Sequence, residues 1–185
     1  MIYGLDASTP PSSVQAANYV AEGYSFFCGY IGGNTPYTWA RSDIDRVANA
    51  GLKFLAIWVA PFGSPTAVNG TLDGKSAVLA MRSRNLSTTI VLDVENGYIP
   101  TAYTKAFVEQ LNLAGVRVIL YGTSITLRAL GTADIVDGVW LCYVPADFIQ
   151  GVPVAQYDWN VWQFSFGSPC DFNVARDDMF FTDVN

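Results

Sequence analysis

Short runs of β-branched and aromatic residues alternate along this chain with amphipathic segments, and this alternation is the feature that most restricts its fold. The runs predict seven strands and an eighth, at residues 2–6, 25–30, 53–59, 89–95, 117–121, 139–143 and 161–164, with the eighth near 152–156. Strands that alternate with helical segments are typical of parallel βαβ units. The predicted fold class is therefore α/β.

The helical segments are concentrated in the first two thirds of the chain. They begin near polar capping residues and end at Gly or Asn, over residues 11–23, 40–51, 73–85 and 101–115. After Tyr121 the helical signal weakens to one short segment at 124–130. This pattern predicts a compact, modified TIM-like (β/α) barrel with few helices in its second half, smaller than the roughly 250 residues of a full eightfold barrel. A doubly wound open sheet is the alternative.

The length and the absence of linker-like stretches indicate that residues 1–185 form a single domain. No run of about 18 apolar residues predicts a membrane span, and the N-terminus "MIYGLDAS" lacks the pattern of a signal peptide. We expect a cytoplasmic protein, a protein released by another route such as phage lysis, or a domain of a longer exported chain. The sequence does not indicate an oligomeric state.

Composition excludes several classes of function. The formal charge of −6 argues against nucleic acid or an anionic membrane as the main partner. The absence of histidine excludes Ser-His-Asp and Cys-His catalysis and ordinary histidine-based metal sites. Cys28, Cys142 and Cys170 are too widely spaced to indicate a metal or redox motif, so we expect mainly buried, reduced thiols. Carboxylates remain as the acid–base groups, and no cofactor is predicted.

Acidic residues gather where predicted strands end. In "TTIVLDVEN" an apolar run ends in Asp93 and Glu95, whose side chains point to the same face of a strand with Cα atoms about 6.5 Å apart. Asp6 ends the first predicted strand, and Asp171 follows the last. Because β/α barrels place active-site groups at the carboxyl ends of their strands, a closed barrel would bring all four acids to one rim.

Crowded carboxyl groups have separated pKa values, so that one can donate a proton while others stay charged. Cleavage of a glycosidic bond requires this combination, because its transition state resembles an oxocarbenium ion. One alternative is that each acid caps a loop or accepts backbone hydrogen bonds. Another is a Mg²⁺ or Ca²⁺ site, which is less favoured because no D-x-D-x-D-G loop is present.

Aromatic residues near the predicted strand ends support a sugar-binding site, because sugar rings stack on aromatic faces. Tyr30, Trp58 and Tyr121 are candidates, with Trp58 favoured for a groove, whereas Trp140 and Trp162 lie within strands and fit a core role. The "YIGGN" segment at 30–34 lacks the spacing of a phosphate-binding loop, and a turn that requires positive φ is the favoured interpretation.

Several segments together resemble a known group of proteins. They are "YGLDASTPPS", "GYIGGN", "LDVEN", "ILYGT" and "WQFSFGSPCDFN". In order and spacing they resemble the glycoside hydrolase-like proteins of the DUF1906 group. That group is related to the family 25 lysozymes, which share the D-x-E strand and the terminal WQ…D-x-N pattern.

The resemblance implies a modified β/α barrel that cleaves the β-1,4 bond between N-acetylmuramic acid and N-acetylglucosamine in peptidoglycan. It implies that Glu95 is the general acid and that Asp93 positions the 2-acetamido group of the substrate. Asp6 would be a further catalytic acid, and the substrate would also contact Asp171, Tyr121 and Gln163. The alternative is a catalytically weak or inactive carbohydrate-binding or structural module on the same barrel, which the small size and shortened second half favour.

Overall fold

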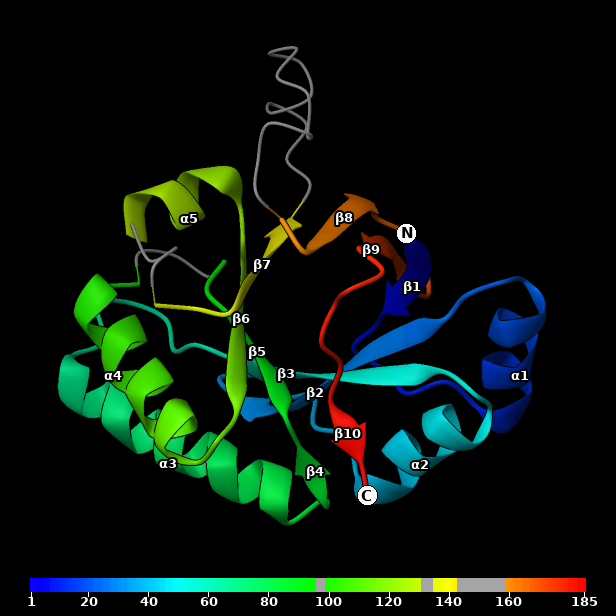
Figure 1. Ribbon diagram of the computed structural model, residues 1–185, viewed down its shortest axis with the longest axis horizontal. Helices are drawn as coiled ribbons and strands as arrows, with labels where there is room; N and C mark the ends of the chain where they lie inside the picture. The colour runs from blue at the N-terminus through cyan, green and yellow to red at the C-terminus, as the bar shows by residue number, and fades with distance from the viewer. Residues whose placement is uncertain (96–98, 131–134, 143–158) are drawn as a thin grey trace.

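The computed structural model describes residues 1–95, 99–130, 135–142 and 159–185, and in this part of the chain the long strands close into a barrel (Figure 1). Around the barrel they are β1 (Ile2–Asp6), β2 (Phe26–Gly33), β3 (Lys53–Val59), β5 (Thr89–Asp93), β6 (Arg117–Gly122), β7 (Gly138–Cys142), β8 (Val161–Ser165) and β9 (Asp171–Ala175). The closed barrel confirms the predicted fold class and excludes the open doubly wound sheet.

The helices pack on the outside of the barrel, with α1 and α2 on one side of the view and α3 and α4 on the other (Figure 1). They are α1 (Ser13–Ala21), α2 (Arg41–Asn49), α3 (Ala67–Arg82), α4 (Thr101–Leu113) and α5 (Ser124–Leu130). Among the described residues after β6, the short α5 is the only helix, as predicted. Within the same residues, no helix has both the length and the apolar character needed to cross a bilayer.

Helix α3 begins before residue 73, where the sequence analysis placed its start. Thr66 caps the helix, since its hydroxyl accepts a hydrogen bond from the Asn69 backbone N–H at 3.3 Å. The Asn69 side-chain oxygen in turn accepts from the Thr66 N–H at 2.9 Å. This reciprocal cap satisfies two N–H groups that lack partners within the helix, so the helix starts at Ala67.

The strand that closes the barrel is β9, which the sequence analysis did not recognise. The strand predicted near 152–156 lies outside the described residues, and Asp171 begins β9 instead of following the last strand. β9 runs antiparallel to both β8 and β1. Its first residue therefore lies at the barrel end where the parallel strands finish, and Asp171 pairs with Asp6.

Alternation along the strands divides the buried residues into two layers. In β3, Leu55, Ile57 and Val59 pack inside the barrel. Phe54, Ala56 and Trp58 belong to the larger cluster that includes helical residues, between the barrel and its helices. The positive φ expected in the "YIGGN" segment is present at Gly33 (92°), whose backbone lies against Val59, but Gly33 is the last residue of strand β2 and not part of a turn.

The C-terminal segment runs from β9 across the barrel to β10 (Figure 1), and it lies against the start of β3, where Thr182 bridges to Phe54. Met179 is buried in the interior cluster, and the Phe181 ring packs against Phe26 with centroids 5.3 Å apart. The Thr182 hydroxyl accepts a hydrogen bond from the Ala56 N–H at 3.0 Å and donates one to the Thr89 carbonyl at 2.7 Å. These contacts join β3, β5 and the C-terminal segment.

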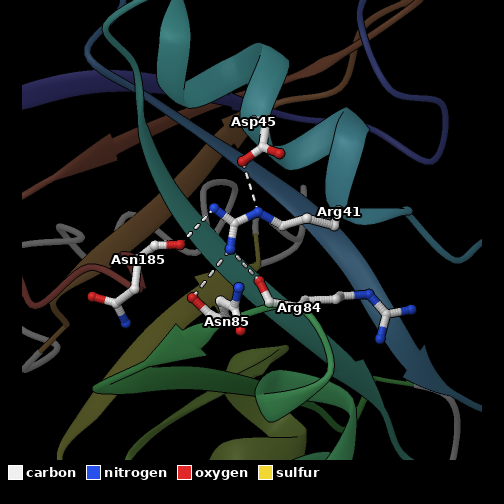
Figure 2. A network of polar contacts seen from close by, with 5 residues as sticks. All are labelled: Arg41, Asp45, Arg84, Asn85 and Asn185. Carbon is white, nitrogen blue, oxygen red and sulfur yellow. Dashed lines mark hydrogen bonds and ion pairs between the residues drawn. The ribbon is translucent and has the colours of Figure 1, made fainter.

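Arg41 connects helix α2 to the C-terminal segment through a network of hydrogen bonds (Figure 2). Its guanidinium donates to Asp45 Oδ1 at 2.6 Å, to the Arg84 carbonyl at 2.5 Å and to the Asn185 carbonyl at 2.7 Å. The contacts link α2 to the turn before β4 (Leu86–Ser87) and to the residue after β10 (Asp183–Val184), which pairs with β4. A planar guanidinium can hold three segments at once because its donors point in fixed directions.

Candidate active site

The four strand-end acids meet in one pocket at the open end of the barrel. Its lining comprises Asp6, Tyr30, Ile57, Asp93, Glu95, Tyr121, Trp140, Phe166 and Asp171. The cavity measures about 80 Å³, which leaves room for only a few water molecules. The predicted convergence of the acids is confirmed, and the pocket suits a small chemical group that projects from a larger ligand.

The acids lie at different depths. Asp6 at the end of β1 and Asp93 at the end of β5 are 7% and 3% exposed. Asp171 is half-buried, and Glu95, beyond the end of β5, is exposed. The site therefore contains two deep carboxyl groups and two at its rim.

Asp93 and Glu95 are coupled through the backbone. The Glu95 N–H donates a hydrogen bond to Asp93 Oδ1 at 3.0 Å, so β5 ends at Asp93, before the predicted end at 95. The loop-capping alternative is thus correct for Asp93, yet its carboxyl group still lines the pocket. One capped oxygen leaves the other available for chemistry.

A buried carboxamide supports the rim on the β8 side. Gln163 is 1% exposed. Its Oε1 accepts a hydrogen bond from the Tyr121 hydroxyl at 2.5 Å, and its Nε2 donates to Asp171 Oδ2 at 2.9 Å. The Gly167 N–H donates to the other Asp171 oxygen at 2.9 Å. Gln163, which the resemblance implies contacts substrate, is not among the residues that line the pocket, and it holds Tyr121 and Asp171, which are.

A second carboxamide supports Asp6, and the sequence analysis did not single it out. Asn173 Nδ2 donates to Asp6 Oδ2 at 2.7 Å, and Asn173 Oδ1 accepts from the Trp140 indole N–H at 3.1 Å. Trp140 is buried, as expected of a core residue, but it also lines the pocket. The spacing of Asp171 and Asn173, two apart on a strand, is the signal that places both on the inner face.

Phe166 was also missed. It follows β8, lines the pocket and is 56% exposed. Tyr30 and Tyr121, which were expected at the site, line it as well. Phe166 lies between the WQ and D-x-N motifs, just after a predicted strand. This position beside a strand end could have identified it as a candidate site residue.

Trp58 does not line the pocket, contrary to the expectation that it forms part of a groove. It is 7% exposed and belongs to the layer beneath the helices. In the pairing of β3 with β5, Val59 is the partner of Asp93. Residues paired in register share a face of the sheet, so Trp58 must point to the opposite face from Asp93.

All three cysteines are free and buried, as expected. One of them nevertheless reaches the site, because the Cys142 thiol donates to Glu95 Oε2 with the two atoms 3.8 Å apart. Burial raises the pKa of the Cys142 thiol to about 12. The thiol therefore stays protonated at neutral pH and acts as a donor to Glu95.

The pKa values of the deep acids are shifted strongly. Burial raises the pKa of Asp6 to about 7; the Asn173 hydrogen bond opposes the rise, and the charges of Asp171 and Glu95 add to it. Burial and then the charge of Glu95 raise the pKa of Asp93 to about 7. The shift arises mainly from burial, whereas the sequence analysis attributed it to neighbouring charges. Both groups exchange protons near neutral pH.

The pKa of Glu95 is also raised, chiefly because its carboxyl group is partly desolvated in the pocket although the residue as a whole is exposed, while the hydrogen bond from the Cys142 thiol opposes the rise. A raised pKa is what a general acid needs, since it must still hold its proton at the working pH. Among the described residues, no group of three or more acidic or thiol side chains is arranged to hold a metal ion. The arrangement supports proton transfer by carboxyl groups.

Comparisons with known proteins show the fold. No protein-family model matches the chain, and no curated protein matches its sequence. An uncharacterised protein from B. stearothermophilus has a TM-score of 0.75 at 21% identity, over 96% of this chain and 97% of that one. A bacterial lysozyme from Streptomyces coelicolor has a TM-score of 0.68 at 20% identity, over 94% of this chain and 91% of that one.

A family GH25 lysozyme from Aspergillus fumigatus is similar over 96% of this chain and 95% of that one, with a TM-score of 0.71 at 20% identity. At such identities the likeness is one of fold. The chain has the same barrel as the family 25 lysozymes.

Proposed function

We propose that this protein is a glycoside hydrolase of the lysozyme type, which cleaves the β-1,4 bonds between N-acetylmuramic acid and N-acetylglucosamine in peptidoglycan. The observation that carries the proposal is the convergence of four carboxyl groups in one pocket. They lie at the open end of a barrel that solved lysozymes and muramidases share. Two deep acids with pKa values near 7, beside two acids at the rim, supply the groups that glycosidic cleavage needs.

Glu95 is the general acid in this proposal. It is exposed at the rim, where it can reach the oxygen of a glycosidic bond that lies across the pocket. Asp93 is deeper and its backbone hydrogen bond fixes its position, which suits a group that orients the 2-acetamido substituent. Asp6 and Asp171 complete the acidic surroundings that stabilise the positive charge of the transition state.

The small cavity agrees with these roles, because a polymer would lie over the rim and insert only a substituent. Phe166 and Tyr30 offer aromatic faces beside the acids on which sugar rings can stack. A peptidoglycan substrate places the site of action at the bacterial cell wall. The protein would reach it by export or by release, as in phage lysis.

The test is hydrolysis of purified peptidoglycan between pH 4 and 8, followed by turbidity and by released reducing ends. Glu95→Gln should lower kcat by about 10² to 10⁴-fold, the usual contribution of a positioned general acid, and should still bind glycan. Glu109→Gln, the same change at an exposed glutamate of α4, is the matched control and should retain activity.

A folded Glu95→Gln protein that cleaves peptidoglycan at the wild-type rate would exclude Glu95 as the acid. Binding of glycan by the wild-type protein without new reducing ends would instead identify the carbohydrate-binding module.

A further inference from the structure

Two buried carboxamides connect aromatic donors to carboxylates of the pocket in the same way. In each, the amide oxygen accepts a hydrogen bond from an aromatic residue, and the amide nitrogen donates to an acid. The two chains are Tyr121–Gln163–Asp171 and Trp140–Asn173–Asp6. The second is the more informative, because its acid is almost fully buried.

The orientation of Asn173 is fixed by chemistry. An indole N–H can only donate, so the Asn173 atom that faces Trp140 must be the oxygen. The amide nitrogen is then turned toward Asp6, 2.7 Å from Oδ2. Asn173 and Trp140 are 0% and 1% exposed, so bulk water does not compete for these contacts. Asp6 therefore faces a donor that cannot rotate away.

We propose that Asn173 is a positioning residue that holds the Asp6 carboxyl group in place and stabilises its ionised form, with Trp140 fixing the orientation of the amide. The catalytic consequence rests on the proposed hydrolase function. The coupling between Asn173 and Asp6 does not, since it is a property of the folded protein alone.

Asn173 matters because the other groups around Asp6 disfavour its charge. The titratable groups that interact with Asp6 come from β1 to β9 and the adjoining loops, and in the described residues they are acids, thiols and phenols: Asp93, Glu95, Asp171, Cys28, Cys142, Cys170, Tyr30 and Tyr121. None of these groups is a cation. Burial and the like charges of neighbouring acids raise the pKa of Asp6, whereas the hydrogen bond from the Asn173 amide lowers it.

The experiment is a pH titration of the Asp6 carboxyl carbon by NMR in protein labelled with ¹³C-aspartate, with Asp6→Asn used to assign the signal. In the wild type the midpoint should lie at about 7. Asn173→Leu keeps the approximate side-chain volume and removes the donor. Loss of a hydrogen bond to the charged form raises a carboxyl pKa, so the midpoint should rise by about one unit or more.

Trp140→Phe provides a second measurement in which the amide remains. The ring still fills the barrel, but Asn173 loses the donor that orients it, so the midpoint should rise by less than in Asn173→Leu. This variant also tests the proposal if Asn173→Leu does not fold. A midpoint within about 0.3 pH units of the wild-type value in either folded variant would overturn the corresponding part of the proposal.

Activity separates this proposal from the proposed function. If the wild type hydrolyses peptidoglycan, the acid limb of its pH–rate profile should move upward in Asn173→Leu with the NMR midpoint, and the rate should recover at higher pH. A purely structural defect would lower the rate equally at every pH, and that result would overturn the positioning role. If the wild type shows no hydrolysis while the midpoint still moves, the function fails and the coupling is established.

Discussion

Asp93→Asn is expected to stabilise the folded protein at alkaline pH while impairing the proposed chemistry. Asp93 is 3% exposed, and its pKa is raised on folding from an ordinary value of 3.8 to about 7. A group with a raised folded pKa favours folding below its unfolded pKa, and this contribution is lost as the pH rises through the folded pKa. The wild type should therefore lose stability between about pH 4 and pH 7.

The magnitude follows from the two pKa values. A carboxyl group whose pKa rises from 3.8 to about 7 on folding opposes folding by about 4 kcal/mol once it is fully ionised, since one pKa unit corresponds to about 1.4 kcal/mol. Local relaxation and water entry reduce such costs. Asparagine has nearly the same shape, never ionises and can still accept the Glu95 N–H. The expected gain in unfolding free energy for Asp93→Asn is about 2 to 4 kcal/mol at pH 8 and near zero at pH 4.

Urea unfolding followed by tryptophan fluorescence at pH 4, 6 and 8 measures this difference by linear extrapolation. Asp178→Asn, the same change at an exposed aspartate, is the control and should show no pH-dependent gain. A variant that is less stable than wild type at pH 8, or a difference that is equal at pH 4 and 8, would refute the reasoning.

Three further predictions concern side chains of the site and of the scaffold. Phe166→Ala should weaken glycan binding about tenfold in equilibrium measurements without a large loss of stability, because the ring is 56% exposed beside the acids. Trp58→Phe should do the reverse, with lower stability and unchanged glycan affinity, because Trp58 packs beneath the helices; equal effects on affinity would contradict the assignment of faces. Arg41→Lys should lower the free energy of unfolding by about 1 to 3 kcal/mol, since an ammonium cannot reproduce the hydrogen bonds to Asp45, Arg84 and Asn185. Urea unfolding compared with Lys53→Arg, a reverse exchange on the exposed start of β3, would show whether the loss is specific.

The positions of the deep acids could be predicted because they depend on local rules. A strand that ends in an acid places that acid at the carboxyl end of a barrel, and a parallel barrel collects such ends on one rim. Asp6 and Asp93 follow this rule directly. Asp171 reached the same rim for a different reason, since it begins an antiparallel strand.

The misplaced residues depend on pairing that a single sequence does not contain. β9 is a short strand that continues an irregular segment, and its role in closure comes from two partners distant in the chain. Neighbouring residues of a strand point to opposite faces, and Val59 is the residue that pairs with Asp93. Whether Trp58 faces the groove or the core therefore depends on strand register, which the sequence does not give. The hydrogen-bond partners of Asn173 and Gln163 could not be predicted for the same reason, because only the closed barrel shows what each amide faces.

Depth in the pocket distinguishes Glu95 from Asp93 more clearly than pKa does. The acids with pKa values near 7 are Asp6 and Asp93, yet both are buried, and a proton donor must reach the leaving oxygen within hydrogen-bond distance. Glu95 is exposed at the rim, the position in which the proposed function requires the proton donor.

A glycan lying across the rim would remove water from around Glu95, so the burial that already raises the pKa of Glu95 should raise it further in the complex. The alkaline limb of the kcat profile, which reports the complex, should therefore lie at higher pH than the limb of kcat/KM, which reports the free enzyme. Coincident limbs would mean that substrate leaves the surroundings of the acid unchanged. Substrate binding would then not desolvate Glu95, and this result would contradict the assignment of Glu95 as the proton donor.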